Sequence, residues 1–247
     1  MQVVGYEPVP DPALLLAEDG EVARLALSPG TELDYALGER HCAGVVQNSN
    51  HDACPNPGAP YCEDHTVPWS VANNADSDEE HVVYLAAFAP DIFKVGVTRS
   101  WRLETRLREQ GADRGALAYT VADGRIAREV ESDMNEDDRL TEWVRVPTKV
   151  TGLHHEVDER AWSALLSALD VDPDADDRFA FDYGLDLTDR PVPETLLAGV
   201  VRGVKGRVLV VDRAGTTYAV DLRDLLGHEL EEGREERDLQ SSLGAFG

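Results

Sequence analysis

The chain of 247 residues has almost no lysine, and its acidic residues greatly outnumber its basic ones. Its 23 basic residues include only three lysines, Lys94, Lys149 and Lys205, against 48 acidic residues and a formal net charge of −25. In molar salt the screening length shortens to about 3 Å, so an acid-rich surface costs little in charge repulsion. We therefore expect a halophilic protein of a salt-filled cytoplasm. The alternative is an acidic protein that binds cations or basic partners.

Long hydrophobic runs are also missing, and cysteines are few. No stretch approaches the roughly 18 consecutive apolar residues that a membrane-spanning helix needs, and the start MQVVGYEPVP has no signal-peptide pattern. These absences predict a soluble, cytoplasmic protein that does not associate with a membrane. Three cysteines are an odd number, and thiols stay reduced in the cytoplasm, so we expect no disulfides.

The three cysteines lie close together and are followed by a histidine. Cys42, Cys54 and Cys62 fall within a proline- and glycine-rich loop, and His65 follows Cys62 in a C-x2-H arrangement. Three thiolates and one imidazole form a tetrahedral zinc shell without an open position, which is typical of structural sites. We therefore predict a structural zinc ion at these four residues.

Two other histidines are near enough in the sequence to replace His65 as the fourth ligand. His51 is the better substitute, because His41 is adjacent to Cys42 and would be strained as a ligand. The remaining interpretation is that the three cysteines are unrelated and simply packed in the interior.

Apolar patterns and turn residues predict β-structure at both ends of the chain and a mixed unit in the middle. The expected hairpins pair 13–17 with 22–27, and 207–212 with 216–222. The expected middle elements are strands 81–88 and 92–98, helix 100–110, strand 116–122 and helix 124–134, followed by a helix at 161–169. This order is β-β-α-β-α.

We therefore predict an α+β protein. A central β-β-α-β-α unit is flanked by β-rich N- and C-terminal segments that pack together, with the zinc-stapled loop at their join. The expected domains are 1–75 (a hairpin segment and the zinc loop), 81–145 (the central unit), 146–228 (a helix and the C-terminal hairpin) and 229–247 (a charged tail). A polar, acidic surface linker is expected at 71–80.

The segment HVVYLAAFAPDIFKVGVTRSWRLETRLREQG, followed by GRIAREVE, resembles the GIY-YIG nuclease superfamily. The tripeptide 82–84 stands at the first motif of that family and 94–96 at the second, with a lysine in place of the second tyrosine. Arg106 stands at the helical arginine, and 127–131 matches the A-x-x-x-E approach to a metal-binding glutamate. The resemblance implies a β-β-α-β-α fold and metal-dependent cleavage of nucleic acid.

The chain as a whole also resembles the domain-of-unknown-function family 2797, here in a haloarchaeal-type sequence. The resemblance is carried by RHCAG at 40–44, the cysteine loop, KVGVTR at 94–99, EQGA at 109–112 and KGRVLVV at 205–211. It covers nearly all of the chain and implies no established activity.

Cleavage of a phosphodiester needs a base for water, a cation for the developing charge and a metal that neutralises the phosphate. The candidate catalytic residues are Tyr84, Lys94, Arg106 and Glu131. Tyr84 or Lys94 could activate water, Arg106 could pair with the phosphate, and Glu131 could hold Mg²⁺ or Mn²⁺. Each also has an ordinary structural explanation, as a packed strand residue, a strand end or a helix-surface charge.

Residues 94–114 are locally basic, with six basic residues against three acidic ones. Arg99, Arg102 and Arg106 recur at helical spacing, so they could face the phosphates of DNA or RNA. The alternative is that they form salt bridges with acidic neighbours. We therefore predict a zinc-stabilised, metal-dependent nuclease, and the rival hypothesis is a non-catalytic nucleic-acid- or protein-binding module with the same fold.

Overall fold

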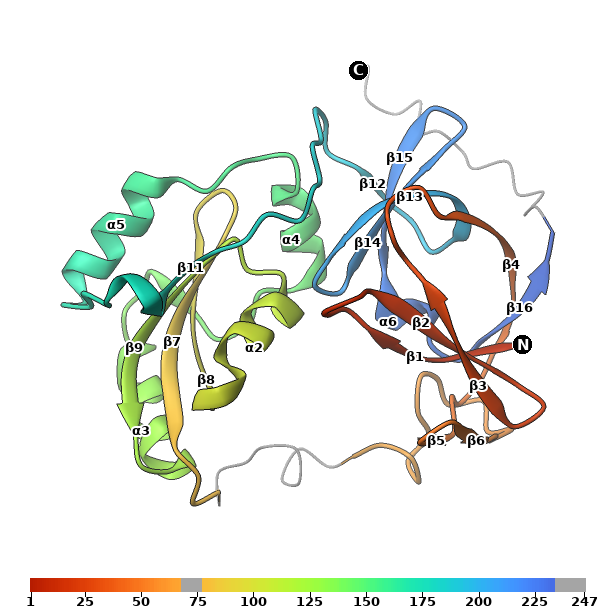
Figure 1. The fold of residues 1–247 in the computed structure, drawn as a ribbon, viewed down its shortest axis with the longest axis horizontal. Helices are drawn as coiled ribbons and strands as arrows, with labels where there is room; N and C mark the ends of the chain where they lie inside the picture. Colours follow the sequence, from red (N-terminus) through yellow and green to blue (C-terminus); the bar gives the residue numbers. More distant parts are fainter. Residues whose placement is uncertain (68–76, 234–247) are drawn as a thin grey trace.

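The computed structural model describes residues 1–67 and 77–233, which form two β-sheets with helices around the smaller one (Figure 1). The larger sheet is built from both ends of the chain, and the smaller sheet is built from its middle. Within the described ranges, no helix is long and apolar enough to cross a membrane.

The larger sheet has 11 strands in the described part of the chain. Its N-terminal strands are β1 (Gln2–Glu7), β2 (Ala13–Glu18), β3 (Glu21–Ala26), β4 (Glu32–Arg40), β5 (Val45–Gln47) and β6 (Asn50–Asp52). Its C-terminal strands are β12 (Val192–Pro193), β13 (Leu197–Lys205), β14 (Val208–Arg213), β15 (Thr216–Asp221) and β16 (His228–Glu232). The order β12-β15-β14-β13-β4-β16-β1-β2-β3-β6-β5 interleaves the two ends, because β4 lies between β13 and β16.

This sheet curls around a single apolar core. Leu14 of β2 and Leu209 of β14, which are far apart in the strand order, belong to the same buried cluster together with Leu33 of β4. Only a curled sheet brings the inward side chains of such distant strands together. The short helix α6 (Leu222–Leu225) adds Leu225 to the same core.

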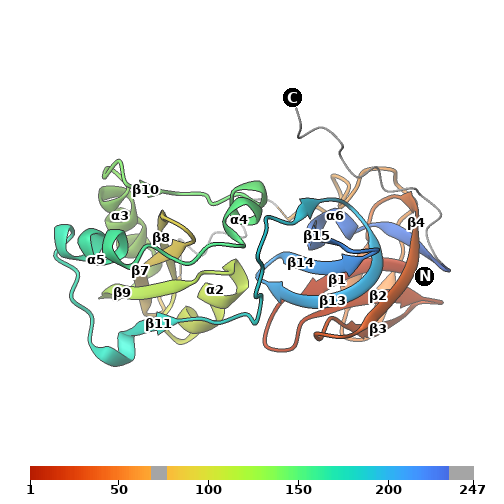
Figure 2. The same cartoon turned by 90° about the horizontal axis from the view of Figure 1, so that it is seen from above.

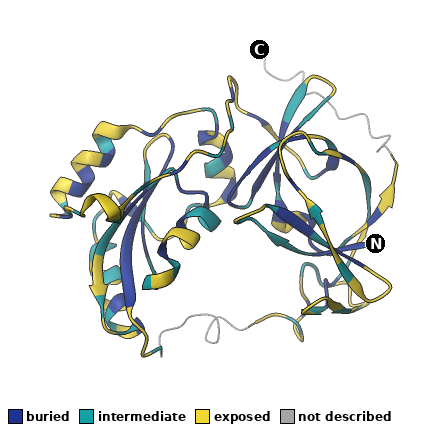
Figure 3. Ribbon diagram, viewed as in Figure 1, coloured by how far each residue is buried: buried dark blue, intermediate teal, exposed yellow. Residues whose placement is uncertain are grey.

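The smaller sheet has the order β10-β8-β7-β9-β11. Its strands are β7 (His81–Phe88), β8 (Ile92–Arg99), β9 (Arg114–Val121), β10 (Leu140–Thr141) and β11 (Arg178–Ala180). The central strand β7 pairs antiparallel with β8 and β9 on either side, and β10 is parallel to β8. Every residue of β7 is buried, and Figure 3 shows the strand dark blue along its length.

Helices and buried loops cover both faces of this sheet. The helices are α2 (Leu103–Gln110), α3 (Gly124–Met134), α4 (Val146–Gly152) and α5 (Glu159–Ala168), with short 3-10 turns η1 (Ser100–Arg102) and η2 (Ala175–Asp177). On one face Val83 and Leu85 pack against residues of α3 and α5, and on the other Tyr84 packs against Leu107 of α2. This alternation follows from the two-residue period of a strand.

The local elements of the middle segment follow the expected order β-β-α-β-α. The hairpins 13–18 with 21–26 and 208–213 with 216–221 are confirmed, and helix 124–134 has the expected bounds. Helix α3 begins at Gly124 because the Asp123 side chain accepts a hydrogen bond from the Ile126 amide. The predicted α+β class with a Cys and His cluster in the loop is also confirmed.

Four features differ from the expectations. The expected helix 100–110 starts with the 3-10 turn η1, and helix α4 and strand β13 were not predicted. The charged tail expected from 229 begins later, because Leu230 enters the core of the larger sheet and 228–232 pair with β4. Residues 71–76 of the expected linker and 234–247 of the expected tail lie outside the described residues.

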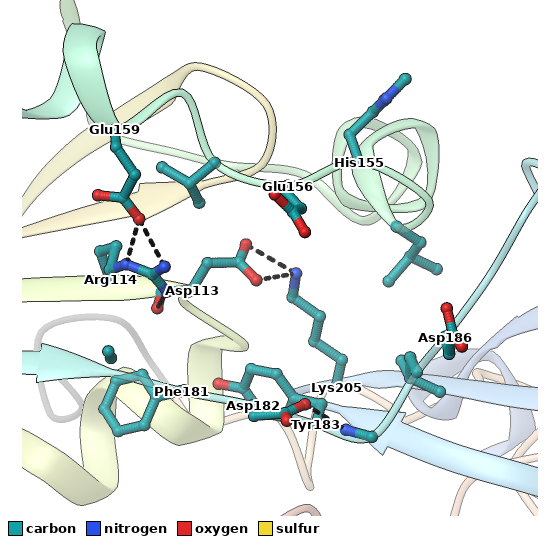
Figure 4. A pocket seen from close by; sticks show the side chains of 15 residues that line it. Asp113, Arg114, His155, Glu156, Glu159, Phe181, Asp182, Tyr183, Asp186 and Lys205 are labelled. Atoms are coloured by element: carbon teal, nitrogen blue, oxygen red, sulfur yellow. Dashed lines mark hydrogen bonds and ion pairs between the residues drawn. The ribbon is translucent and has the colours of Figure 1, made fainter.

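The two sheets meet through α2, α4 and the turn between β13 and β14 (Figure 2). Val150 and Leu153, on and just after α4, pack on Val208 and Ala219, which point away from the inner core of the larger sheet. Beside this contact lies a cavity of about 680 Å³ in which the carboxylate of Asp113 faces the ammonium group of Lys205 (Figure 4).

Candidate functional site

The first candidate site is a cluster of four potential metal ligands in the loop after β4. The ligand atoms of Cys42, Cys54, Cys62 and His65 all lie within 4.8 Å of one another. His65 Nδ1 is 3.2 Å from Cys42 Sγ and 3.3 Å from Cys62 Sγ, and the Cys54 and Cys62 sulfurs are 4.0 Å apart. Ligands at about 2.0–2.3 Å from a tetrahedral zinc ion have similar mutual separations. The four residues are therefore positioned so that they could bind a metal ion such as zinc.

Backbone amides around Cys42 favour its ionised form. Burial alone raises the pKa of this thiol, but hydrogen bonds from the Cys62 and Gly44 amides and from His65 outweigh it and lower the pKa to about 6. A thiolate is the form that binds a metal. The cysteine loop is joined to the larger sheet by Gln2 on β1, whose Nε2 donates to the carbonyls of Cys42 and Gly227.

The two alternative histidine ligands lie outside this cluster. His41 is within hydrogen-bond distance of the Cys54 carbonyl at 3.0 Å, and the His51 ring is 2.9 Å from the Ala43 carbonyl. Both rings therefore hold the loop backbone, while His65 completes the Cys3His set.

The second candidate site is a cavity of about 410 Å³, which we call the Glu131 pocket. All four candidate catalytic residues line it: Tyr84 from β7, Lys94 from β8, Arg106 from α2 and Glu131 from α3. The first and the last of these residues are 47 positions apart in the sequence, and the four come from four different elements. β7 and β8 are antiparallel partners, and α2 and α3 pack on the two faces of their sheet. The side chains from these four elements meet beside Gly96 and Val97 of β8, which line the same pocket.

Tyr84 lines this pocket from the buried strand β7. It is 1% exposed, and its hydroxyl accepts a hydrogen bond of 2.5 Å from Gln110 Nε2. A Cβ atom at Gly96 would lie 2.6 Å from the tyrosine hydroxyl, so only glycine fits at that place in β8. Burial raises the pKa of Tyr84, with Arg106 and Gln110 opposing it, so the phenol is protonated at neutral pH.

The pKa of Lys94 is lowered, whereas that of Tyr84 is raised, and both shifts favour the neutral side chain. Its Nζ donates to the backbone carbonyls of Val95 at 3.0 Å and Glu142 at 2.8 Å. Burial lowers the pKa of Lys94 to about 8, and the repulsion of nearby arginines adds to this, while Glu131 opposes it. A lysine with such a pKa is neutral in an appreciable fraction of molecules near neutral pH.

Arg106 and Glu131 are both engaged in ion pairs on their own helices. Arg106 lies 3.4 Å from Glu109, and the Glu131 carboxylate lies 2.6 Å from Arg128. The second oxygen of Glu131 is not part of that pair. The pocket is lined by two arginines, one lysine and the two carboxylates of Glu131 and Glu142, and this set could bind an anion together with a cation.

Sequence reasoning missed several residues that line the pocket, among them Asn135, Glu142 and Trp143. Asn135 lies four positions after Glu131, so helical periodicity could have placed both on one face. Its Oδ1 atom is buried and accepts no hydrogen bond from the described residues. Glu142 and Trp143 follow the short strand β10, and nothing in their local sequence marks them.

The three arginines predicted to face nucleic acid are only partly brought together. Arg102 and Arg106 line a smaller cavity of about 210 Å³ with Arg128, but Arg99 does not and pairs with Glu79 at 2.6 Å. Arg102 also pairs with Glu109. The alternative of salt bridging is therefore realised for all three arginines.

Comparison with known proteins gives one match. Residues 69–230 match the sequence model of the family described as "Protein of unknown function (DUF2797)". This match covers about two thirds of the chain and includes the Glu131 pocket, whereas the cysteine loop precedes it. No curated protein and no solved structure matches the chain.

Proposed function

The chain belongs to the family described as Protein of unknown function (DUF2797), and from the Glu131 pocket we propose that it is a metal-dependent nuclease. One observation carries this proposal. Tyr84, Lys94, Arg106 and Glu131 were selected from sequence motifs alone, and all four line a single cavity. Residues chosen for unrelated structural reasons would have no cause to meet there.

We propose further that residues 81–134 form a GIY-YIG-like unit. The support is the element order β7-β8-α2-β9-α3, with β7 between its two antiparallel partners. The glycine of the second motif, Gly96, is in contact with the tyrosine of the first motif, Tyr84. The two motifs therefore depend on each other physically, as parts of one site.

In this proposal Lys94 is the base. A water oxygen attacks phosphorus and passes its proton to Lys94 Nζ, while the bond from phosphorus to the leaving sugar oxygen breaks and that oxygen takes a proton from solvent. Arg106 contacts the non-bridging phosphate oxygens through its planar guanidinium group. Tyr84 remains a neutral phenol that accepts from Gln110 and keeps its own hydrogen for donation to the phosphate.

In this proposal a divalent cation such as Mg²⁺ or Mn²⁺ would be held beside these residues. Mg²⁺ prefers one or two carboxylates with several waters, and Glu131 has one carboxylate oxygen outside its pair with Arg128. The buried Oδ1 of Asn135, which also lines this pocket, would be a second oxygen ligand for such a cation. When bound there, the ion would neutralise charge on the phosphate.

We propose that zinc is the ion of the Cys3His cluster and that its role is structural. Four protein ligands leave no open position for a substrate. The loop 53–67 has no strand or helix, and the zinc ion would add to the hydrogen bonds that Cys42 and Ala43 make with its backbone. The cysteine loop contacts β1 and the Gly227 backbone, and zinc would therefore fasten the join between the two ends of the chain.

We also propose that the protein works in a cytoplasm of high salt. The support is the net charge of −25 and the position of the three lysines. Lys205 is buried and Lys94 and Lys149 are half-buried, so the exposed basic side chains of the described residues are arginines.

A second candidate function is a non-catalytic binding module for nucleic acid or protein. One observation favours it: the carboxylate of Glu131 is held at 2.6 Å by Arg128, and Arg106 is paired with Glu109. A site in which both charges are used for structure would bind a ligand without cleaving it.

The two functions are separated by a cleavage assay on branched, single-stranded and duplex DNA and on RNA. The assay contains Mg²⁺ or Mn²⁺ and is run at low and at molar KCl. It compares the parent with Arg106→Ala and Glu131→Ala. Glu129→Ala is the matched control, because Glu129 is on the same helix and pairs with Arg125 but does not line the pocket.

We expect cleavage by the parent and the Glu129→Ala variant, and loss of cleavage in the other two. Loss of at least about a hundredfold corresponds to removal of a group that stabilises the transition state. If the parent cleaves none of these substrates with either metal ion, the nuclease proposal is wrong and the binding module takes its place.

A further inference from the structure

A second cavity continues from the Glu131 pocket towards the larger sheet. This junction pocket has a volume of about 350 Å³ and shares Lys94, Arg106, Glu142 and Trp143 with the Glu131 pocket. Its far wall comes from the larger sheet, through Tyr6, Pro8 and Arg207. Its near wall includes Lys149 of α4. The two cavities together form a path from Glu131 to the join of the two sheets.

The junction pocket holds positive charge that carboxylates do not neutralise. Lys149 Nζ donates to the Gln110 backbone carbonyl at 2.6 Å and lies 4.9 Å from the centre of the Phe88 ring. Among the described residues, Lys94 likewise donates to backbone carbonyls and not to a carboxylate. Burial lowers the pKa of Lys149 to about 8, and the repulsion of Arg207 and Lys94 adds to this. Two poorly compensated ammonium groups in one cavity favour an anionic ligand.

The balance of charge along the path is also positive. Five cations line the two pockets: Lys94, Arg106, Arg128, Lys149 and Arg207. Three carboxylates line them: Glu109, Glu131 and Glu142. Arg207 is also paired with Asp221 at 2.7 Å, so the local excess is one positive charge in a chain of net charge −25. A ligand with phosphates spaced along it would meet cations at both ends of the path.

Trp143 lines both the Glu131 pocket and the junction pocket. Its side chain is exposed, at 73%, and its Nε1 donates to Glu142 at 3.2 Å. An exposed aromatic ring beside cations is the usual platform on which an unpaired base stacks. A base within a duplex has neighbours on both of its faces, so it cannot stack on a protein side chain. Each cavity is of the size that encloses a small ligand, which suits one nucleotide more than a double helix.

We propose that the junction pocket binds a single strand of nucleic acid next to the scissile phosphate, with Lys149 and Arg207 on its backbone and Trp143 stacked on a base. This inference rests on the proposed nuclease function, because it names the substrate class of the same site. It assigns specificity to residues of the larger sheet and of α4, outside the β7–α3 unit. The sheet formed by the chain ends is then part of the substrate site.

The test is fluorescence anisotropy with labelled oligothymidylate and oligouridylate of about 15 nucleotides, near the upper end of common single-strand site sizes. A duplex of the same length is the competitor, and no Mg²⁺ or Mn²⁺ is added, so binding is measured without cleavage. The variants are Trp143→Ala and Lys149→Met. Trp101→Ala is the matched aromatic control, because Trp101 is 71% exposed and lines neither pocket. Arg24→Met on β3 is the matched cationic control.

We expect the single strand to bind more tightly than the duplex. Trp143→Ala should weaken binding at least about fivefold, the effect of one lost stacking contact. Lys149→Met should reduce the slope of log affinity against log salt by about 0.7, and Lys149→Arg should restore it. Both controls should bind like the parent. A preference for oligothymidylate or for oligouridylate would show whether the site takes DNA or RNA. Either preference supports the proposal, which is for a single strand.

The proposal is overturned if Trp143→Ala binds like the parent, or if the duplex binds more tightly than the single strand. Because Trp143 is exposed, its replacement cannot fail for lack of folding. The cleavage assay on the parent is scored separately. Cleavage with unchanged binding in the variants would keep the nuclease and remove the single-strand pocket. Binding as expected without cleavage would keep the pocket and make the chain a single-strand binding module.

Discussion

Lys205 and Asp113 form a buried ion pair that joins the larger sheet to the smaller one. The ammonium nitrogen lies 2.6 Å from Oδ1 and 2.7 Å from Oδ2 of the aspartate, and their side chains are 9% and 15% exposed. Asp113 precedes β9, and its Oδ2 also accepts from the Ala89 amide. Lys205 ends β13 and lies beside the Tyr183 ring. One carboxylate therefore fixes two loops of the smaller sheet and one strand end of the larger sheet.

We predict that Asp113→Asn lowers the free energy of unfolding by about 3 kcal/mol or more, because it leaves a buried ammonium group without its counter-charge. The amide keeps an oxygen for the Ala89 bond, so the loss reports on charge. Adding Lys205→Met should recover part of the loss, because the unpaired charge is then removed. Urea denaturation of the two single variants and the double variant measures this. If the loss in the double variant equals the sum of the losses in the two single variants, the two charges do not interact.

The Cys3His cluster gives a second prediction. Cys62→Ser should lower the melting temperature and reduce bound zinc well below one ion per chain, because one of four ligands is lost. The measurement is elemental analysis of the purified protein together with thermal unfolding. His51→Ala is the control, since the His51 ring lies at the Ala43 carbonyl and outside the cluster. Unchanged zinc in Cys62→Ser would remove the assignment.

Sequence reasoning identified this cluster because its residues are close along the chain. The ligands span 42–65, and their chemistry leaves few alternatives. The hairpins and helix α3 were also accessible, because apolar period and turn residues are local signals. Tyr84, Lys94, Arg106 and Glu131 required a family resemblance, since each one alone looks like an ordinary strand or helix residue.

The junction pocket could not be predicted in this way. Tyr6 and Arg207 stand about 200 positions apart and meet Lys149 only after the two chain ends have interleaved in one sheet. Strand β13 was missed because Gly199 and Gly203 interrupt its apolar pattern. The low pKa of Lys94 is likewise a property of burial between distant elements, which no spacing in the sequence indicates.

Lys149 gives a prediction for the pH dependence of stability. Its pKa in the folded protein is about 8, against 10.5 for an ordinary lysine. Between these values the unfolded chain binds more protons, so this residue makes the folded state more stable as pH rises from about 8 to about 10.5. The neighbouring cations are Arg207, Lys94, Arg106 and Lys205, and the carboxylates lining the pocket are Glu109 and Glu142.

The measurement compares melting temperatures of the parent and Lys149→Met across this pH range. The other titrating groups are present in both proteins, so the difference between the two melting temperatures reports on Lys149. We expect the parent to gain stability relative to the variant as pH rises. A difference that stays constant, or that moves in favour of the variant, would contradict the assigned burial of this ammonium group.

The net charge of −25 gives a prediction for salt. Raising KCl from about 0.1 M to about 1 M shortens the screening length from about 10 Å to about 3 Å, which removes most repulsion between surface carboxylates. The melting temperature should therefore rise across this range. Sucrose titrated over the same range is the control, because it favours the compact state without screening charge. A melting temperature that KCl lowers would contradict adaptation to high salt.

Two glycines in hairpin turns of the larger sheet provide a matched pair for the contact between the sheets. Gly206 and Gly215 both have positive φ, 55° and 79°. A Cβ atom at Gly206 would lie 2.5 Å from the Gly111 amide nitrogen, at the end of α2, whereas one at Gly215 would meet nothing within 4 Å. The backbone of α2 therefore comes into direct contact with the turn between β13 and β14.

Gly215→Ala should lower the free energy of unfolding by about 1–2 kcal/mol, the cost of a left-handed conformation for alanine. Gly206→Ala carries the same cost and must also push α2 away from the turn. Because α2 carries Arg106 and its end carries the Gln110 carbonyl that holds Lys149, this variant should also weaken single-strand binding. Urea denaturation and the anisotropy assay measure the two effects. If the two variants lose equal stability and bind alike, then the contact between α2 and the turn does not position the junction pocket.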